Sequence, residues 1–341
     1  MRRKRLTMLV GAVAVLAAAV TAGLIASTGS ARDAKAQKGY KVFLLPKFIG
    51  IPVFTQNAVG AKLAAKELGD KVTYNGPTDA SATKQVQFIN SAVRQGFNAI
   101  IISADDPNAV APALKRAQQR GVKVISYDAD TQTGARTIYV SPPSAKDIGV
   151  AQVEWVGSQI GYKGQIAILS AAPTAANQNL WIKYMKAALK TKKYRGMTLV
   201  KTVYGNDNDT QSAQQAQALL QAYPNLKGII SPTTVGVAAA ARVLSQAHKC
   251  NVRLTGLGLP SQMRQYVKSG CVKKVGLWSE TDFGYLAEYV AHNVLTGKLT
   301  GKVGQSIKAG HLGKRTVLKG RTIILSKPLV FTKANIDKYH F

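Results

Sequence analysis

Acidic residues are scarce in this sequence of 341 residues, which has 16 Asp and Glu against 46 Lys and Arg and a formal net charge of +30. Such a basic chain is compatible with nucleic-acid binding through a surface that releases counterions. The lysines are scattered, however, and no basic run alternates with the aromatic residues that stack on bases. We therefore expect no nucleic-acid partner and favour an exported protein that works beside an anionic wall or membrane surface.

Cysteine is almost absent, because Cys250 and Cys271 are the only two in the chain. A metal site needs more ligands than these, and the four histidines lie far apart, so we expect no metal. Each cysteine precedes a predicted strand, and adjacent parallel strands would bring both together across a helix expected at 260–269. In an oxidising compartment this favours a disulfide that contributes about 3 kcal/mol. Two buried free thiols are the alternative.

The motifs of the common catalytic and nucleotide-binding sites are missing. No Gly-x-Gly-x-x-Gly follows the first predicted strand and no P-loop is present, so nucleotide binding of either kind is unsupported. The sequence also has no Gly-x-Ser-x-Gly elbow, no HExxH histidines, and no Cys–His pair with a third member. We therefore expect a protein that is not an enzyme and uses no cofactor.

Long apolar runs are limited to one, Leu6–Ser27, near the start of the chain. Basic residues at 2–5 precede it and Ala34-Lys35-Ala36 fits a cleavage site, so residues 1–36 have the layout of a secretory signal peptide. A run of about 20 apolar residues can also stay as a membrane anchor. Export with cleavage is favoured, because Ala and Gly dominate the run. No cysteine follows the run directly, which excludes a lipid anchor on an N-terminal Cys.

The rest of the chain repeats one rhythm twice. In each of two segments, 41–128 and 165–258, four short apolar runs alternate with helical stretches. The runs begin near Val42, Val72, Ile100 and Val122, and then near Ile166, Leu199, Gly228 and Val252. This alternation predicts βαβ units and parallel sheets, and about 300 residues suit two domains. We expect an α/β fold of two doubly wound lobes, with a ligand cleft at the carboxyl ends of their strands.

The few carboxylates gather at the carboxyl ends of the first lobe's strands. For Asp79 and one of the pair Asp105 and Asp106, a role as helix cap or turn residue is favoured over a role in the cleft, with Pro107 at the first helical position. Asp128 ends the strand nearest the crossover, and no helix follows directly for it to cap. We expect the Asp128 side chain to face the cleft.

Polar and aromatic side chains are expected to converge on this cleft. Planar polar side chains bind neighbouring hydroxyl groups as donor and acceptor at once, and aromatic rings cover the C–H face of a sugar. The combination predicts binding of a polyol without catalysis. The residues concerned are Lys47, Phe54, Asp105, Asp128, Asn177, Gln178, Thr234 and Trp278.

Eight short segments carry a family resemblance. They are Phe43–Lys47, Tyr74–Thr78, Asn98–Ala104, Asp128–Thr131, Pro173-Thr174, Asn177–Trp181, Gly276–Trp278 and Asn335–Tyr339. In these segments the chain resembles the periplasmic sugar-binding proteins of ABC importers, and most of all the branch of the autoinducer-2 and rhamnose-type binding proteins. The resemblance covers essentially the whole mature chain. It implies the type I periplasmic-binding-protein fold, with two lobes joined by a three-strand hinge.

The resemblance also implies a set of ligand-binding residues. In the autoinducer-2 proteins a Lys after the first strand, an Asp ending the fourth, an Asp-Gln pair and a Pro-x-Ala segment hold the ligand. Lys47, Asp128, Gln178 and Pro232 match this pattern. The implied ligand-binding set, joined with the residues above, is Lys47, Phe48, Phe54, Asp105, Asp128, Asn177, Gln178, Pro232, Thr234 and Trp278.

Two positions depart from the autoinducer-2 pattern. Asn177 stands where those proteins have the Asp of the pair, and Thr234 stands where they have the Ala. The changes alter hydrogen-bond polarity and pocket volume, and segment 231–236 looks more like the rhamnose-type members. The expected ligand is therefore a deoxyhexose such as rhamnose, with autoinducer-2 as the alternative.

The resemblance implies that the two lobes close on the ligand and that the closed protein docks on an ABC permease. We expect a monomer in the periplasm or on the outer face of the cytoplasmic membrane or cell wall. The expected N-terminal lobe is 37–131 plus 275–306, and the C-terminal lobe is 137–272 plus 322–341. Hinge segments are expected near 132–136, 273–275 and 307–321. A LacI-like regulator core is a remote alternative, since the secretory start occupies the place of its helix-turn-helix.

Overall fold

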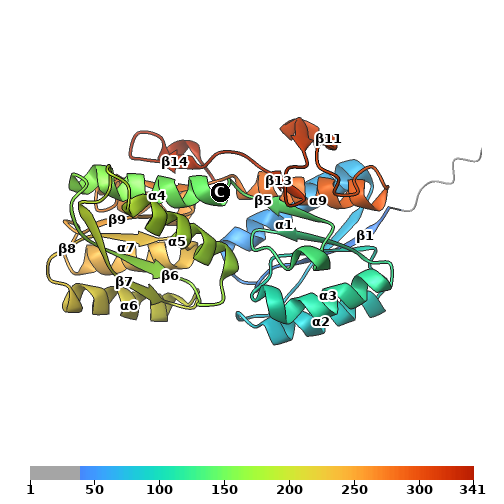
Figure 1. Ribbon diagram of the computed structural model, residues 1–341, viewed down its shortest axis with the longest axis horizontal. Helices are drawn as coiled ribbons and strands as arrows, with labels where there is room; N and C mark the ends of the chain where they lie inside the picture. The colour runs from blue at the N-terminus through green and yellow to red at the C-terminus, as the bar shows by residue number, and fades with distance from the viewer. Residues whose placement is uncertain (1–38) are drawn as a thin grey trace, which may run out of the picture. The chain divides into compact units, whose positions relative to one another are not determined.

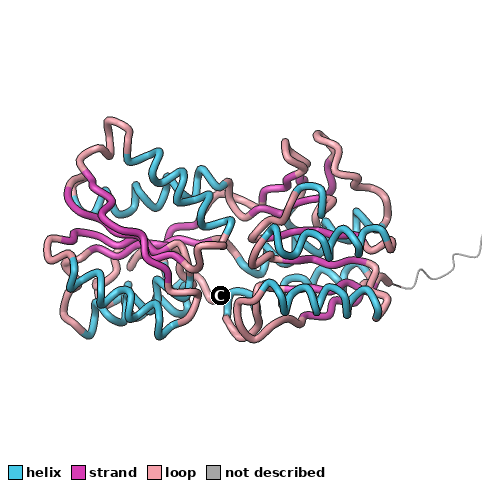
Figure 2. Tube along the Cα trace, turned by 60° about the horizontal axis from the view of Figure 1, so that its bottom comes forward, coloured by secondary structure: helices cyan, strands magenta, loops and turns pink. Residues whose placement is uncertain are grey.

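The computed structural model describes residues 39–341. The predicted signal peptide lies outside this part of the chain. None of the helices between residues 39 and 341 combines the length and apolar character that a membrane span requires. Two parallel sheets, each flanked by helices, form two lobes (Figures 1 and 2). The predicted α/β fold with two parallel-sheet lobes is confirmed.

The first lobe is built on a six-stranded parallel sheet. Its strands are β1 (Lys41–Leu45), β2 (Lys71–Tyr74), β3 (Ala99–Ile102), β4 (Lys123–Tyr127), β5 (Ile138–Ser141) and β13 (Thr322–Ile324). They lie in the order β13-β5-β4-β3-β1-β2. Because successive strand residues point to opposite faces, Val42 and Leu44 enter one hydrophobic cluster whereas Phe43 and Leu45 enter another.

Helices cover both faces of this sheet. Helices α1 (Pro52–Leu68) and α9 (Glu280–Leu295) pack on one face, and α2 (Ala82–Arg94) and α3 (Pro107–Gln119) pack on the other. The cap predicted at the pair Asp105 and Asp106 is confirmed, because Asp106 accepts from two backbone N–H groups of α3 and Pro107 occupies its first turn. Ser81 caps α2. The caps fix where each helix starts and hence where the preceding strand ends.

The second lobe contains a four-stranded parallel sheet in the order β7-β6-β8-β9. Its elements are β6 (Gly164–Ser170), β7 (Met197–Tyr204), β8 (Leu226–Ser231), β9 (Arg253–Gly256), and the helices α4 (Ala145–Ile160), α5 (Ala176–Leu189), α6 (Asp209–Ala222), α7 (Thr234–Gln246) and α8 (Pro260–Lys268). Helices α4 and α5 pack together, as do α6 and α7. Figure 2 shows strands lying between layers of helices in each lobe.

Short elements complete the two lobes. The strands β10 (Val275–Leu277) and β14 (Leu329–Phe331) pair antiparallel, and a bridge from Leu257 to Gly276 joins them to the second sheet. A hairpin of β11 (Ser306–Lys308) and β12 (Lys314–Thr316) encloses the 3₁₀ turn η2 (Gly310–Leu312). Two further 3₁₀ turns are η1 (Thr133–Ala135) and η3 (Ile336–Lys338).

The strand pairings differ from the sequence-based division of the chain at three places. The segment 137–141 was expected in the C-terminal lobe, but β5 pairs with β4 in the first sheet, and β13 then pairs with β5. Conversely, β10 pairs with β14 and belongs with the second sheet. The chain therefore crosses between the lobes at 142–144, 278–279 and 325–328, and not in the expected hinge segments. Local sequence identifies a strand, but its sheet is decided by distant partners.

Cys250 and Cys271 form a disulfide in the structure, with their Cα atoms 4.8 Å apart. The bridge joins the segment before β9 to the segment after α8, across the helix that was expected between the two cysteines. It therefore closes one strand–helix unit at the end of the second lobe that is remote from the strand carboxyl ends.

Candidate functional site

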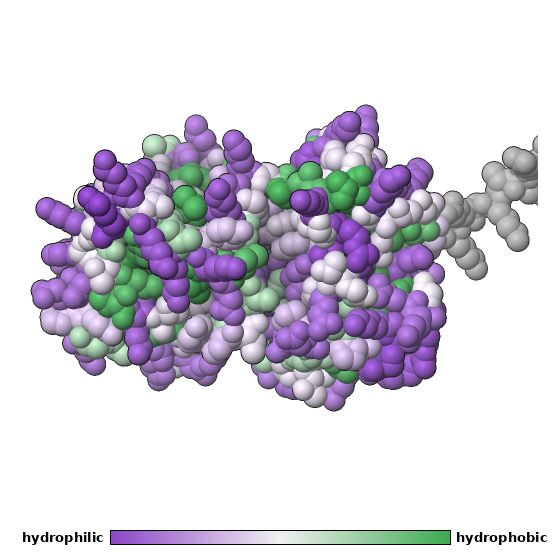
Figure 3. All heavy atoms as spheres, in the orientation of Figure 1, coloured by the Kyte–Doolittle hydropathy of each residue, from purple (hydrophilic) through white to green (hydrophobic). Residues whose placement is uncertain are grey.

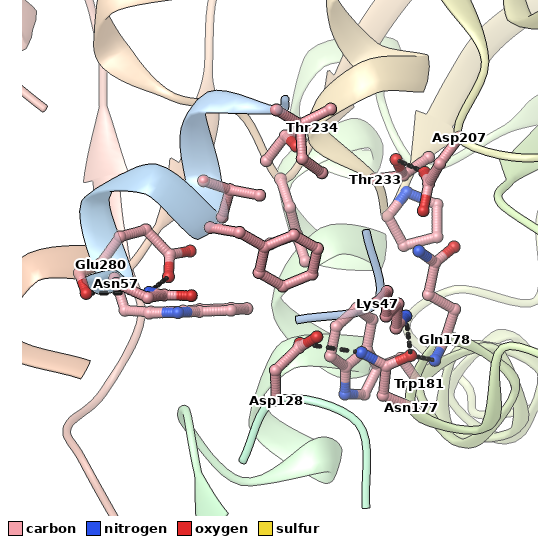
Figure 4. A pocket seen from close by; sticks show the side chains of 16 residues that line it. Lys47, Asn57, Asp128, Asn177, Gln178, Trp181, Asp207, Thr233, Thr234 and Glu280 are labelled. Atoms are coloured by element: carbon pink, nitrogen blue, oxygen red, sulfur yellow. Dashed lines mark hydrogen bonds between the residues drawn. The ribbon is translucent and has the colours of Figure 1, made fainter. Parts of the chain in front are cut away.

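A small cavity lies where the carboxyl ends of the strands of both lobes face each other. Its volume is about 50 Å³. The first lobe contributes residues that follow β1 and β4 and residues of α1, and the second lobe contributes the loops and first turns after β6, β7 and β8 (Figure 4). The lining residues are Lys47, Ile51, Val53, Phe54, Asn57, Asp128, Asn177, Gln178, Trp181, Asp207, Pro232, Thr233, Thr234, Leu257, Trp278 and Glu280.

Asp128 directly follows β4 and has a backbone φ of 55°, in the left-handed region that few non-glycine residues adopt. Its carboxylate accepts a hydrogen bond from Ser103 Oγ at 2.7 Å, and its carbonyl accepts one from the hydroxyl of Tyr139 at 2.8 Å. These bonds hold the carboxylate toward the second lobe. Strain of this kind is typical of positions whose side-chain direction is used by a site.

Asn177, in the first turn of α5, joins the two lobes. Its Nδ2 donates to Asp128 Oδ1 at 3.0 Å, while its Oδ1 accepts from the backbone N–H of Gln178 at 2.9 Å and from Lys47 Nζ at 3.5 Å (Figure 4). Because donors occupy Oδ1, the amide nitrogen must face the Asp128 carboxylate. An aspartate at position 177 would instead place two carboxylates against each other.

Gln178 offers a directed donor to the cavity. Its Oε1 accepts from Ser170 Oγ at 2.7 Å and from the backbone N–H of Ala171 at 2.8 Å. With the oxygen fixed in this way, the amide nitrogen is left for other partners, and Gln178 lines the cavity while only 4% exposed. The donor at Gln178 and the acceptor at Asp128 are complementary to a ligand with several hydroxyl groups.

Aromatic rings form one wall of the cavity. The rings of Trp181 and Trp278 meet edge to face with centroids 6.2 Å apart, and Phe283 supports Trp278 at 6.3 Å. Phe54 also lines the cavity, and Phe48 packs behind it at 6.3 Å. Such rings give the flat apolar area that fits the C–H face of a sugar.

Glu280 is a buried carboxyl group beside the cavity. Asn57 Nδ2 donates to its Oε2 at 2.7 Å and to its carbonyl at 2.9 Å (Figure 4). Its Oε1, like the indole N–H of Trp278, is buried without a hydrogen-bond partner in the described chain. Burial raises the pKa of Glu280 well above its usual value, since desolvation disfavours the charged form. Burial therefore favours the protonated form of this group.

Lys47 lies between two further carboxyl groups. Asp207 has a left-handed φ of 48° and accepts a hydrogen bond from Thr233 Oγ1. Burial raises the pKa of Asp207, and it raises the pKa of Asp105 to about 6, while the nearby Lys47 charge opposes both shifts. Asp105 also accepts from the backbone N–H of Ser81 at 2.7 Å.

Eight of the ten residues in the predicted ligand-binding set line this one cavity. They are Lys47, Phe54, Asp128, Asn177, Gln178, Pro232, Thr234 and Trp278. Phe48 lies behind Phe54, and Asp105 lines a neighbouring cavity of about 500 Å³ together with Lys47 and Asp207. Whether any of these residues binds a ligand stays a prediction.

Several lining residues were missed in the sequence. Asn57 has no distinctive local pattern, whereas Trp181 and Thr233 lie in segments that resemble the family but were not singled out as ligand-binding residues. Asp207 and Glu280 carried a usable signal, because carboxylates are scarce and Asp207 follows a predicted strand. Within residues 39–341 no group of His, Cys, Asp and Glu is arranged to hold a metal ion.

The fold and the site define a class, that of two-lobed solute-binding proteins with a polyol-type cavity between the lobes. The family model described as periplasmic binding protein domain matches residues 42–299, and the chain belongs to this family. The protein therefore has the type I periplasmic-binding-protein architecture, and it is a sugar-binding component of an ABC transporter that acts outside the cytoplasm. Members of this family bind their ligands and are not enzymes.

Three solved structures illustrate the similarity. A sugar ABC transporter protein from Actinomyces odontolyticus is 44% identical with a TM-score of 0.73, covering 89% of this chain and 98% of that one. A solute-binding protein from Clostridium phytofermentas with bound L-rhamnose is 34% identical with a TM-score of 0.85, covering 88% and 98%. LsrB from Clostridium saccharobutylicum in complex with AI-2 is 27% identical with a TM-score of 0.83, covering 88% and 100%.

Proposed function

We propose that this protein captures a deoxyhexose such as L-rhamnose in the cavity between its lobes and delivers it to the membrane permease of an ABC importer. The observation that carries the proposal is the pairing, at one cavity, of a fixed acceptor on the first lobe with fixed donors on the second. Asp128 and Gln178 face the cavity with their orientations set by other hydrogen bonds. A sugar with neighbouring hydroxyl groups would bridge the two lobes.

The apolar part of the lining supports a deoxy sugar in particular. Ile51, Val53 and Leu257 line the cavity next to the aromatic wall. A 6-deoxyhexose carries a methyl group where an ordinary hexose has a hydroxymethyl group. Apolar side chains accept the methyl group without cost, whereas an added hydroxyl would be desolvated without a partner. The similarity to the L-rhamnose complex agrees with this choice.

Autoinducer-2 is the second candidate. Lys47, Asp128, Gln178 and Pro232 match the pattern of its binding proteins and all line the cavity, and the AI-2 complex of LsrB has a similar fold. Asn177 and Thr234 favour the deoxyhexose, because Asn177 supplies a donor to Asp128 where an aspartate would not.

The hinge is part of the proposal. We infer that the three crossings at 142–144, 278–279 and 325–328 change conformation when the lobes close. Ligand contacts with both lobes would stabilise the closed form through differential affinity for the two states.

Calorimetric titration with L-rhamnose, autoinducer-2 and common pentoses tests the choice of ligand. The expected result is saturable binding of L-rhamnose and weaker or absent binding of the others. Preferential binding of autoinducer-2 would replace the first candidate by the second, and turnover of any ligand would contradict a binding-only role.

Asp128→Ala should weaken sugar binding by roughly 10- to 100-fold. The change removes a charged hydrogen-bond acceptor, worth about 1.5–3 kcal/mol, from the cavity. Asp337→Ala is the control, because Asp337 is an exposed partner of Lys268 and Arg264 and does not line the cavity. Equal affinities of the two variants would show that the cavity is not the sugar site.

A further inference from the structure

Basic side chains gather at the edge of the first lobe opposite its cavity. Strands β1, β2 and β4 each begin with an exposed lysine, which is Lys41, Lys71 or Lys123. Parallel pairing places Lys41 opposite Lys71, and β3 lies in register between β1 and β4. These lysines therefore line the amino edge of the sheet.

Three arginines extend the same edge. Arg94, Arg116 and Arg120 line a cavity of about 320 Å³ between the last turns of α2 and α3. Lys41 Nζ donates to the carbonyl of Gln95 at 3.0 Å, so the end of α2 is held against the start of β1. On the face seen in Figure 3, hydrophilic side chains cover the region over α2 and α3.

The three arginines have no acidic partners. Within residues 39–341, the guanidinium groups of Arg94, Arg116 and Arg120 make no hydrogen bond or ion pair, whereas those of Arg136 and Arg242 are bound to carboxylates. A helix dipole favours a cation in a last turn, but it does not explain three guanidinium groups around one cavity. Their planar donor sets match the oxygens of phosphate groups.

The first lobe is electrically polarised along its strands. Asp79, Asp105, Asp106 and Asp128 all follow the carboxyl ends of strands, whereas the amino edge has few acids that are free. At that edge Asp70 is bound to His292 Nδ1 at 2.7 Å. Glu67 accepts from the hydroxyl groups of two tyrosines of α9. The amino edge is thus available to an anionic surface while the cavity faces away from it.

We propose that this amino-edge patch, made of Lys41, Lys71, Arg94, Arg116, Arg120 and Lys123, docks on the anionic phospholipid headgroups of a membrane. A membrane is favoured over other polyanions because a component of an ABC transporter works beside one, and its anionic headgroups complement the patch in charge. The apolar run Leu6–Ser27 is joined to β1 by residues 28–40, which reach at most about 45 Å when extended. The chain enters β1 at this same edge, and each basic residue near an anionic lipid surface adds to the attraction.

Vesicle binding of the full chain tests the proposal. Wild type and the triple variant Arg94→Gln, Arg116→Gln, Arg120→Gln are compared on vesicles of phosphatidylcholine alone and of phosphatidylcholine with phosphatidylglycerol. The triple variant should bind the phosphatidylglycerol vesicles roughly 10- to 100-fold more weakly at low salt. Binding to pure phosphatidylcholine should not change, because the apolar run is intact in both proteins.

The matched control is Lys183→Gln, Lys186→Gln, Lys190→Gln. These exposed lysines line a cavity of about 550 Å³ on the second lobe, and their removal takes away the same charge. The control should keep the wild-type affinity for phosphatidylglycerol vesicles. An equal loss of vesicle affinity in both triple variants would show that only the net charge of the protein matters, and this would overturn the proposal. Patch-dependent binding to soluble polyphosphate without any to vesicles would overturn it as well.

Folding of the variants is checked separately. The three arginines are exposed and glutamine is a good helix former, so thermal unfolding of the triple variant should match wild type. The single variant Arg116→Gln provides a second test with a smaller expected loss, of about 5-fold. Unchanged affinity in this variant and in the triple variant would contradict the proposal.

Discussion

Asn177 shows how one side chain sets the polarity of its surroundings. Its oxygen is occupied by the N–H of Gln178 and by Lys47, so its nitrogen faces Asp128. The Asp128 carboxylate therefore has a donor from each lobe, Ser103 from the first and Asn177 from the second. The amide at position 177, where the autoinducer-2 pattern has an acid, is therefore part of the contact between the lobes.

Glu280→Gln should stabilise the protein at pH 7. Burial raises the pKa of Glu280 well above its usual value of 4.5, so ionisation is favoured only in the unfolded chain. The free energy of unfolding therefore decreases as the pH rises above about 4.5. Glutamine keeps an acceptor for Asn57 and removes this loss, so we expect a higher free energy of unfolding for the variant at pH 7.

Urea unfolding of wild type and Glu280→Gln at pH 4 and pH 7 measures this effect. The two proteins should have similar stability at pH 4, and the variant should be more stable at pH 7. A difference of equal size at both pH values would indicate a packing effect. Glu280→Ala, which leaves Asn57 without its carboxyl partner, should be destabilised at both.

Single residues were predictable from the sequence to different degrees. Asp128 was expected at the cleft because a strand ends there with no helix to cap, and the structure places it in the cavity lining. Asn57 and Glu280 were missed, since they lie on helices α1 and α9 that are far apart in the chain. The packing of the two helices brings these residues to the cavity. The spacing of residues along the sequence does not predict that packing.

Among the elements, the disulfide-closed unit of α8 makes a separate prediction. Cys250 and Cys271 are separated by 21 positions, and a loop of that size gives a stabilisation of about 3 kcal/mol when cross-linked. The double variant Cys250→Ala, Cys271→Ala should lose an amount of this order in urea unfolding. Reductant should lower the stability of wild type to a similar extent.

The reductant also supplies the control for this prediction. It should not change the stability of the double variant, which has no cysteine left. Equal stability of wild type and variant without reductant would contradict a structural role for the bridge. Sugar affinity should be unaffected, because neither cysteine lines the cavity.

Strands were recognised in the sequence more reliably than their sheets. Apolar runs marked β1 to β4 and β6 to β9 correctly, because each is a short apolar segment bounded by turn residues. The segment of β5 was also recognised, but not its pairing with β4 and β13. The sequence of a parallel strand does not indicate which of the two sheets it joins. The partner of β5, β13, lies near the other end of the sequence.

In the molecule as a whole, the two lobes touch through polar groups at the place where a ligand is proposed to bind. Asn177 of the second lobe donates to Asp128 of the first, and Lys47 of the first donates to Asn177. This arrangement of the lobes thus has hydrogen bonds of its own. A ligand that adds bonds to both lobes shifts the population further toward closure, and a change that weakens the contact shifts it back.

Asn177→Asp should open the protein at pH 7. The substitution places a carboxylate about 3 Å from that of Asp128, and two such groups cannot both ionise at low cost. Small-angle scattering without ligand should show a larger radius of gyration than wild type, and sugar affinity should fall with the closed fraction. Acidification should reverse both effects, because one proton shared by the pair restores a donor between them.

Gln217→Glu is the control, since it adds the same charge at an exposed position of α6 outside the cavity lining. Scattering from Asn177→Asp that superimposes on wild type at pH 7 would show that this contact does not govern closure.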